Sequence, residues 1–257
     1  MSDIYYGIPT YKRVDEQITL NFLKGIGIDK EHIILATQLK DEYEKCKELY
    51  SDYCTVIYRE NVHNLSGNRN TIINYLPKDT NVLILDDDIE GFEVNRNGKL
   101  QKLSGKHFIE IVERMFHIAR KYNSKLWSIY PVENAYFMEK EPIIKFNKAI
   151  ICVHGVITSD LRYNEEQTVK EDYLFVGDNL AKGYPTLRLE NVTSNAKHLT
   201  NKGGCKDQWG TNKECMERVL KKYPQYIVKN TKREGEILMK KNIMVGIKEK
   251  NKKVRLF

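Results

Sequence analysis

Short apolar runs alternate with longer amphipathic segments along the first half of the chain. The apolar runs predict strands, and the segments between them have the apolar spacing of helices. The predicted strands cover residues 4–9, 32–37, 54–60 and 82–85, and the predicted helices run up to Leu23 and over 40–50 and 68–76. Strands and helices that alternate in this way form parallel pairs with helices on both faces of the sheet. We therefore expect an α/β, Rossmann-like mixed sheet that is largely parallel in its N-terminal half.

The second half is less regular and contains two further predicted helices. A hairpin is predicted to turn at Asn97-Gly98, because this dipeptide suits a tight turn. Ser104 is a suitable N-cap for the longest predicted helix. The remaining expected elements are helices over 104–122 and 171–183 and strands over 126–132, 146–159 and 186–192. Since no linker rich in Pro, Gly or Ser divides the chain, we expect one domain over 1–222. A basic C-terminal extension, 223–257, would pack on this domain or flank it.

The positive charge is concentrated near the C-terminus. The 257 residues carry a net charge of +7, yet residues 218–255 alone carry +10 and the rest of the chain −3. A basic tail on a mildly acidic body suggests a polyanionic partner, with nucleic acid as the first candidate. The candidate DNA contacts are Lys240, Lys241, Lys252 and Lys253. An ordinary solvated surface in a Lys-rich chain is the alternative.

Composition narrows the class of protein. With 41% hydrophobic and 30% charged residues, the chain has the composition of a globular protein. No apolar run approaches the ~20 residues that a membrane span needs, and the N-terminus lacks the pattern of a secretory signal. The five cysteines are odd in number and show no CxxC spacing. This usage fits a reducing compartment, so we expect a cytoplasmic protein without a membrane span.

Three consecutive aspartates, Asp86, Asp87 and Asp88, follow the apolar strand at 82–85. Side chains two apart on an extended chain share a side, so Asp86 and Asp88 are expected to share a target while Asp87 faces away. Paired carboxylates suit Mg²⁺ or Mn²⁺, which also binds substrate phosphates. A solvated acidic turn is the alternative. The sequence lacks GxxxxGK[ST] and has no GxGxxG after its first strand, which argues against the common nucleotide-binding loops.

Several polar segments follow predicted strands directly. Pro9-Thr10, residues 61–70 and the three aspartates all do so, and ligands of such sheets bind beyond the carboxyl ends of the strands. We therefore expect these segments to converge on one crevice. Arg69 would lie there, where its guanidinium would pair either with a diphosphate or with a neighbouring aspartate.

A strand that delivers a D-x-D into such a crevice resembles the GT-A nucleotide-sugar glycosyltransferases. The resemblance implies that the first strand and its loop hold the nucleotide, while the D-x-D binds ribose and a divalent metal on the diphosphate. The implied donor-site residues are Pro9, Thr10, Tyr11, Arg13, Asn68, Arg69, Asp86, Asp87, Gly203 and Gly204. The implied metal ligands are Asp86, Asp88 and His198, with Mn²⁺ or Mg²⁺ as cofactor.

A second acidic pair, Glu171 and Asp172, stands at the predicted start of a helix. The helix dipole alone would explain acidic residues there. Many inverting GT-A enzymes carry such a pair, and a carboxylate so placed can take the proton of the acceptor hydroxyl. We expect Asp172 to be the base, with Glu171 as its substitute or orienter.

The combination IPTYKR, NLSGNRNTIINYL, VLILDDDI, LRYNEEQTVKEDYLF and GG is similar to the TET/JBP-associated glycosyltransferases. These GT-A enzymes are common in phages and related to the base J glucosyltransferase. The resemblance implies transfer of a hexose from a nucleoside diphosphate sugar, such as a UDP-sugar, to a hydroxymethylated pyrimidine in DNA, within the host cytoplasm for a phage protein. An acceptor in the cell envelope (glycan, protein or lipid), a nucleotidyltransferase and a non-catalytic nucleic-acid-binding module are the alternatives. The oligomeric state is left open.

Overall fold

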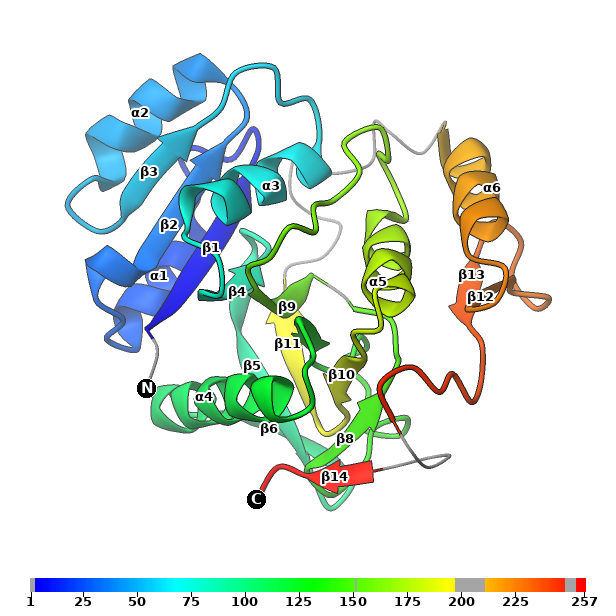
Figure 1. Cartoon of the computed structure of the whole chain (residues 1–257). Coiled ribbons are helices and arrows are strands. Elements are labelled where there is room, and N and C mark those ends of the chain that lie inside the picture. The colour runs from blue at the N-terminus through cyan, green and yellow to red at the C-terminus, as the bar shows by residue number, and fades with distance from the viewer. Residues whose placement is uncertain (1–2, 151, 197–210, 248–252) are drawn as a thin grey trace.

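Nine strands of the described residues form one mixed sheet, in the order β14-β8-β10-β7-β9-β4-β1-β2-β3 (Figure 1). The computed structural model describes residues 3–150, 152–196, 211–247 and 253–257. The strands of this sheet are β1 (Ile4–Thr10), β2 (Ile33–Thr37), β3 (Thr55–Tyr58), β4 (Asn81–Leu85), β7 (Leu126–Ser128), β8 (Ile143–Phe146), β9 (Val153–Ile157), β10 (Thr186–Leu189) and β14 (Lys253–Arg255). The α/β fold predicted from the alternating pattern is thus confirmed.

The first four strands of this sheet are parallel, as predicted. β1 pairs in parallel with both β2 and β4, and β2 pairs in parallel with β3. The direction changes at β9, which is antiparallel to β4 on one side and to β7 on the other. The carboxyl ends of β1, β2 and β4 therefore lie at one edge of the sheet, and this places the segments that follow them close together.

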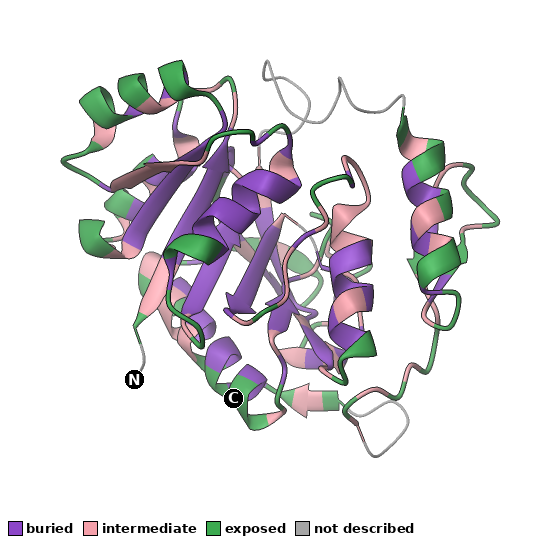
Figure 2. Cartoon of the chain, turned by 45° about the horizontal axis from the view of Figure 1, so that its top comes forward, coloured by how far each residue is buried: buried purple, intermediate pink, exposed green. Residues whose placement is uncertain are grey.

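Helices cover both faces of the sheet. They are α1 (Ile18–Gly25), the short 3₁₀ helix η1 (Lys30–His32), α2 (Lys40–Tyr50), α3 (Leu65–Tyr75), α4 (Gly105–Lys121), α5 (Glu171–Ala181) and α6 (Asn212–Lys222). Alternate residues of β2 show the two faces: Ile33 and Leu35 belong to the core that includes α1 and α4, while Ile34 and Ala36 belong to the core that includes α3 and α5. Because both faces are covered, the central strands are continuously buried (Figure 2).

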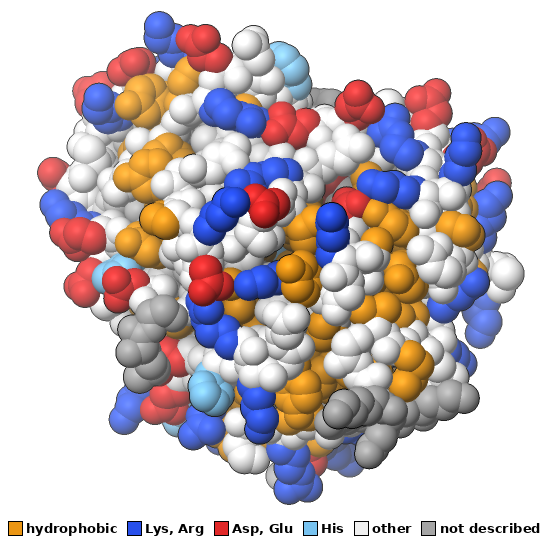
Figure 3. Space-filling view, in the orientation of Figure 1, with side chains coloured by type: hydrophobic (Ala, Val, Ile, Leu, Met, Phe, Trp, Pro, Cys, Tyr) orange, Lys and Arg blue, Asp and Glu red, His pale blue; other side chains and the backbone are white. Residues whose placement is uncertain are grey.

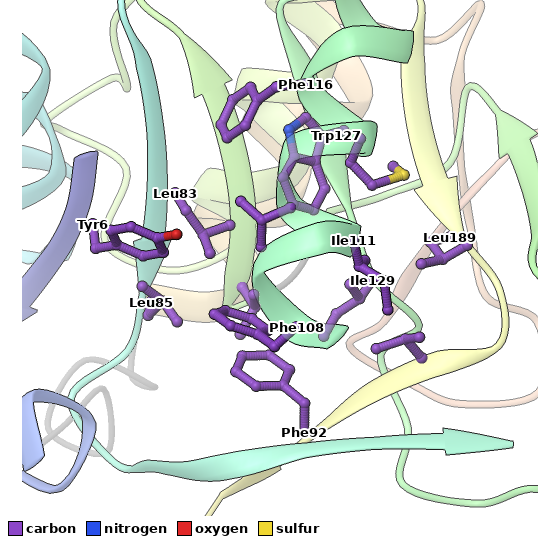
Figure 4. Packing of buried hydrophobic residues seen from close by; sticks show 14 of the residues in the cluster. Tyr6, Leu83, Leu85, Phe92, Phe108, Ile111, Phe116, Trp127, Ile129 and Leu189 are labelled. Atoms are coloured by element: carbon purple, nitrogen blue, oxygen red, sulfur yellow. The ribbon is translucent and has the colours of Figure 1, made fainter. Parts of the chain in front are cut away.

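The larger core contains a group of aromatic side chains beneath α4 (Figure 4). The rings of Phe92 and Phe108 stack with centroids 4.3 Å apart, and Phe116 meets Trp127 edge-on at 5.2 Å. α4 carries Phe108 and Phe116 on one side, and Ser104 caps the helix by accepting a hydrogen bond from the His107 N–H. The strongly amphipathic pattern of residues 104–122 therefore becomes the longest helix of the described chain.

Two smaller sheets complete the described structure. One contains β5 (Ile89–Arg96), β6 (Lys99–Lys102) and β11 (Val192–Ala196), and the other pairs β12 (Ile227–Lys229) with β13 (Ile237–Met239). The predicted hairpin is the β5–β6 pair, whose turn has positive φ at both Asn97 and Gly98. β5 begins directly after the aspartates, so these residues connect the main sheet to the smaller one.

Two predicted strands were wrong in their extent. The segment 146–159 is divided between the end of β8 and the whole of β9, because the chain takes a left-handed conformation at Asn147, with φ of 55°. The strand predicted at 126–132 is shorter than expected and ends at Ser128.

The basic C-terminal extension contacts the rest of the protein along its length, including at α5, at Asn147 and at β8. Tyr223 is buried against α5, where a Cβ on Gly177 would lie only 2.1 Å from the tyrosine ring. β14 pairs with β8 and forms an edge of the main sheet. No helix in the described part of the chain is long and apolar enough to cross a membrane.

Candidate active site

The three aspartates occupy a turn between β4 and β5, which Thr19 of α1 stabilises. The Thr19 hydroxyl donates to the Asp86 carbonyl at 2.6 Å and accepts from the Ile89 N–H at 2.9 Å. The Thr19 N–H donates to the Asp87 carbonyl at 3.2 Å. The sequence analysis did not identify Thr19 as a site residue, and only its place at the start of the helix after the Arg13 loop hints at this role.

Asp87 does not face away from the crevice, contrary to the prediction. Its carboxylate accepts from the Thr10 hydroxyl at 2.8 Å and pairs with Arg13, whose Nη1 also lies 3.2 Å from Asp88 Oδ2. The prediction failed because residues 86–88 form a turn, and side chains alternate only on an extended chain. Asp87 and Asp88 therefore share one guanidinium, while Asp86 has a different partner.

The loop after β1 is tied to this turn. Gln17 donates to the Thr10 hydroxyl at 3.1 Å and to the Arg13 carbonyl at 2.6 Å. Pro9 is buried within β1, and Tyr11 is half-buried with the Lys12 ammonium 4.9 Å from its ring centroid. The structure thus brings the predicted nucleotide loop and the aspartates together at the carboxyl ends of β1 and β4.

Arg69 connects the aspartates to the second acidic pair. Its side chain is 3% exposed; Nη2 lies 3.3 Å from Asp86 Oδ1, and Nη1 lies 2.9 Å from Glu171 Oε1. Its guanidinium also lies over the Tyr163 ring, 5.4 Å from the centroid. Burial opposes the charge, but the surrounding phenol and carboxylates raise the pKa of Arg69, so it is a permanent cation between two acids.

The polar residues of α3 mainly hold the loop that leads to α5. Asn70 exchanges two hydrogen bonds of 2.9 Å with the Tyr163 backbone, and the Ser66 hydroxyl donates to the Gln167 carbonyl at 2.9 Å. Asn68 is completely buried, and its amide group donates to the carbonyls of Thr10 and Ala36 at 3.0 Å each. The amide nitrogen of Asn68 thus joins the ends of β1 and β2, and the expected contact between Asn68 and the donor stays a prediction.

Glu171 and Asp172 form the first turn of α5, as the sequence predicts. The turn begins abruptly because Lys170 takes a left-handed conformation with φ of 60°. Burial, followed by repulsion from Glu171, raises the pKa of Asp172 to about 7. A carboxylate with this pKa suits proton abstraction near neutral pH.

Asp86 also binds its proton unusually tightly. Burial raises the pKa of Asp86 to about 7. Arg69 opposes this effect, and the charges of Asp88 and Asp87 add to it. Nevertheless 31% of the Asp86 side chain is exposed, so the carboxylate borders the crevice rather than the core. Burial first, and then Asp86, raise the pKa of the neighbouring Cys152 to about 12, so its thiol stays protonated and is not a nucleophile.

The acidic cluster has the chemistry of a divalent metal site. Asp86 and Asp88 each use one carboxylate oxygen in an ion pair within the described residues: Asp86 Oδ1 with Arg69 and Asp88 Oδ2 with Arg13. Within the same residues no three His, Cys, Asp or Glu side chains form a complete metal site. Mg²⁺ commonly takes only one or two carboxylates and completes its shell with water and phosphate oxygens, so this donor set fits. The other predicted residues of the crevice, His198, Gly203 and Gly204, lie outside the described residues.

The predicted DNA-binding lysines lie on the C-terminal segments. Lys240 is half-buried, Lys241 is exposed, and Lys253 of β14 lies 3.7 Å from Glu139. Lys252 lies outside the described residues. Of the three that the structure describes, Lys240, Lys241 and Lys253, none contacts the aspartates or their partners.

Tyr163 is a further residue that the sequence analysis missed. Its ring stacks on Phe175 with centroids 4.0 Å apart, and its hydroxyl lies 2.6 Å from His154 Nε2. This buried pair supports the guanidinium of Arg69 from below the crevice. The only feature of the sequence that pointed to Tyr163 was an aromatic residue in the polar segment between β9 and α5.

Solved glycosyltransferase structures share this fold. Glucosyl-3-phosphoglycerate synthase from Mycobacterium tuberculosis, in complex with Mn²⁺, UDP and phosphoglyceric acid, matches with a TM-score of 0.52 and 9% identity, over 86% of this chain and 78% of that chain. A mannosyltransferase from Pyrobaculum calidifontis, in complex with GDP-Man and Mn²⁺, matches with a TM-score of 0.53 and 9% identity, over 87% and 64%. No protein-family model matches the chain, and no curated protein matches its sequence. The fold is that of the GT-A glycosyltransferases.

Proposed function

We propose that this protein is a metal-dependent glycosyltransferase that moves a sugar from a nucleoside diphosphate sugar to a hydroxymethylated pyrimidine in DNA. The observation that carries the proposal is Arg69, which joins the D-x-D carboxylate Asp86 to the acidic pair on α5. One crevice then holds both a site for a leaving diphosphate and a candidate base. A nucleic-acid-binding module would not need that combination.

The donor would lie along the carboxyl ends of β1 and β4. Arg13 is fixed by Asp87 and Asp88, so its position beside the nucleotide loop is set before any ligand binds. Asp86 and Asp88 would hold Mn²⁺ or Mg²⁺, and this ion would supply positive charge where the diphosphate leaves. Both structural neighbours named above were solved with Mn²⁺ and with UDP or GDP-Man bound, which supports this assignment of the crevice.

The acceptor side would be at the start of α5. Asp172 is placed to take the proton of an acceptor hydroxyl at its carboxylate, while Glu171, fixed by Arg69 at 2.9 Å, would orient the pair. Asp172 is favoured over Asp87 because the two carboxylate oxygens of Asp87 are already engaged by Thr10 and Arg13.

The DNA acceptor is supported by charge and by the resemblance of the motifs. Residues 218–255 carry a net charge of +10, and this segment includes the exposed Lys241 and Lys253. On the face shown in Figure 3, Lys and Arg side chains are interspersed with Asp and Glu, so the body is not uniformly basic. The four cysteines within the described residues are free thiols, which fits the reducing cytoplasm of a host cell.

The test is incubation of the protein with hydroxymethylated duplex DNA, Mn²⁺ and a panel of nucleotide sugars, followed by mass spectrometry of the nucleosides. We expect a hexosylated pyrimidine with one of the donors. If the donor is hydrolysed but no base is modified, the assignment as a glycosyltransferase stands and the DNA acceptor is excluded. Neither hydrolysis nor transfer with any donor would overturn the proposed reaction.

A further inference from the structure

A cavity of about 500 Å³ lies away from the aspartate crevice, between the end of β8 and the C-terminal segment. Five lysines line it: Lys145, Lys148, Lys240, Lys241 and Lys253. Apolar surface from Phe146, Ile243 and Ile247 completes the wall. We call this feature the lysine cavity. Its volume is in the range of sites that hold a nucleotide-sized ligand.

Asn147 joins the two walls of the lysine cavity. This residue is 2% exposed, and its amide group donates to the Ile243 carbonyl at 2.8 Å and to the Val245 carbonyl at 3.1 Å. Its side-chain oxygen accepts from the Thr186 N–H at 3.2 Å, which ties the same residue to β10. Segments that are far apart in the sequence are thus held at a fixed separation, and the lysines are brought together without a ligand.

The positive charge of the lysine cavity is only partly neutralised. Lys145 pairs with Glu139 at 2.8 Å and with Glu190 at 3.2 Å. For Lys148, Lys240 and Lys241, by contrast, no carboxylate of the described chain lies within ion-pair distance. Like charges gathered in a concave surface repel one another, so an anion that enters the cavity relieves this repulsion.

The ionisation of Lys148 is consistent with this excess of positive charge. Burial lowers the pKa of its ammonium group, and nearby Arg188 lowers it further, while Glu190 opposes the effect. Lys145 and Lys241, from opposite walls of the cavity, add to the lowering. The lysines are therefore close enough to act on one anion together.

We propose that the lysine cavity is a second anion site, which binds phosphoester groups independently of the donor crevice. Ammonium groups bind phosphate as point charges from several directions, which suits a cavity lined by lysines and by no arginine of the described chain. Apolar wall residues such as Phe146 and Ile243 suit the sugar or base that accompanies the phosphate. The phosphoester belongs either to a nucleic-acid strand or to a free nucleotide. The nucleic-acid form of this site rests on the proposed function, because Lys240, Lys241 and Lys253 are also the predicted DNA contacts. Binding requires no turnover, so it can be tested separately from sugar transfer.

The test compares the double variant Lys148→Gln/Lys241→Gln with a matched control, Lys45→Gln/Lys106→Gln. The control lysines are exposed on α2 and α4 and do not line the lysine cavity. Fluorescence anisotropy measures binding of a short unmodified duplex over a range of salt concentrations, and calorimetry measures binding of a mononucleotide and of pyrophosphate. Melting temperatures of both variants show that they are folded.

If the phosphoester belongs to a nucleic-acid strand, we expect the cavity variant to bind the duplex about tenfold more weakly. The slope of log K against log[salt] should then become shallower by about 0.9 for each lost phosphate contact. For a free nucleotide, we expect unchanged duplex binding and the loss of one nucleotide site. Either result, with the control unchanged, supports the lysine cavity as a phosphoester site. Equal behaviour of the two folded variants toward all three probes would overturn it, whether or not the protein transfers sugar.

Discussion

Arg69 and Glu171 meet across the crevice, with 2.9 Å between Nη1 and Oε1, although 102 positions separate them in the chain. The other terminal nitrogen of the same guanidinium reaches Asp86. A single buried cation thus balances an acid from the end of β4 and an acid from the start of α5. The two halves of the candidate site consequently depend on each other for their charge balance.

Replacing Arg69 by Met should strongly destabilise the protein. The substitution leaves Asp86 and Glu171 without their shared counter-charge, and breaking a buried pair in this way costs about 3–5 kcal/mol. Urea unfolding measures the loss. The control is Arg233→Met, which removes a 3.5 Å pair with Glu236 whose side chains are 74% and 40% exposed, and which should cost less than about 1 kcal/mol. Similar losses in both variants would contradict the bridging role of Arg69.

Asp88→Asn should abolish metal-dependent turnover of the donor without unfolding the protein. The variant keeps the shape of the side chain and removes one of three adjacent negative charges, so the melting temperature without metal should change little. We expect the rate to fall by about a hundredfold or more, as it does when a group that stabilises developing charge is lost. Donor hydrolysis with added Mn²⁺ measures the rate. Full activity in this variant would remove Asp88 from the metal site.

The rate of transfer should rise with pH through about 7. Asp172 acts as a base only when it is deprotonated, and burial together with Glu171 raises its pKa to about 7. Below that pH the rate should drop about tenfold per pH unit, because the fraction of carboxylate falls in that proportion. The dependence of kcat/KM on pH measures this limb.

Glu171→Gln provides a sharper test of the same assignment. Removing the like charge beside Asp172 lowers the pKa of Asp172, so the acidic limb should move to lower pH. The pKa of Asp86 is also raised to about 7, but its largest influences are burial, Arg69, Asp88 and Asp87, whereas repulsion from Glu171 is the second largest influence on Asp172. An acidic limb that does not move would assign the titration to another group.

Gly177→Ala should loosen the packing of the C-terminal extension on α5. A Cβ at this position would lie 2.1 Å from a ring carbon of the buried Tyr223, and overpacking of this kind typically costs about 1–3 kcal/mol. Gly25→Ala is the matched control, since its Cβ would meet nothing within 4 Å. Thermal unfolding compares the two. A stable Gly177→Ala variant would show that the extension adjusts without cost.

The parallel half of the sheet could be predicted because its signals are local. Each strand of β1 to β4 is an apolar run, and the rule that crossovers are right-handed places their carboxyl ends on one edge. Thr10, Arg13, Arg69 and the aspartates come together for that reason. The helix over residues 171–183 and its acidic first turn could also be predicted from the sequence, and α5 confirms both.

The features that sequence reasoning missed depend on contacts between distant residues. The orientation of Asp87 depends on a turn that Thr19 stabilises. The burial of Asn68 depends on the ends of β1 and β2, which its amide group joins. The lysine cavity combines Lys145 and Lys148 with lysines about a hundred positions later, which no local pattern in the sequence relates.

The position of β14 also affects how the protein folds during synthesis. β8 is made long before β14, and until β14 emerges from the ribosome the outer backbone groups of β8 have no strand to pair with. An uncovered edge of this kind can recruit strands from other nascent chains. The basic residues that precede β14 in the sequence and lie within it would disfavour such association, because like-charged chains repel one another. Late docking of this final strand would therefore protect the sheet against aggregation as well as complete it.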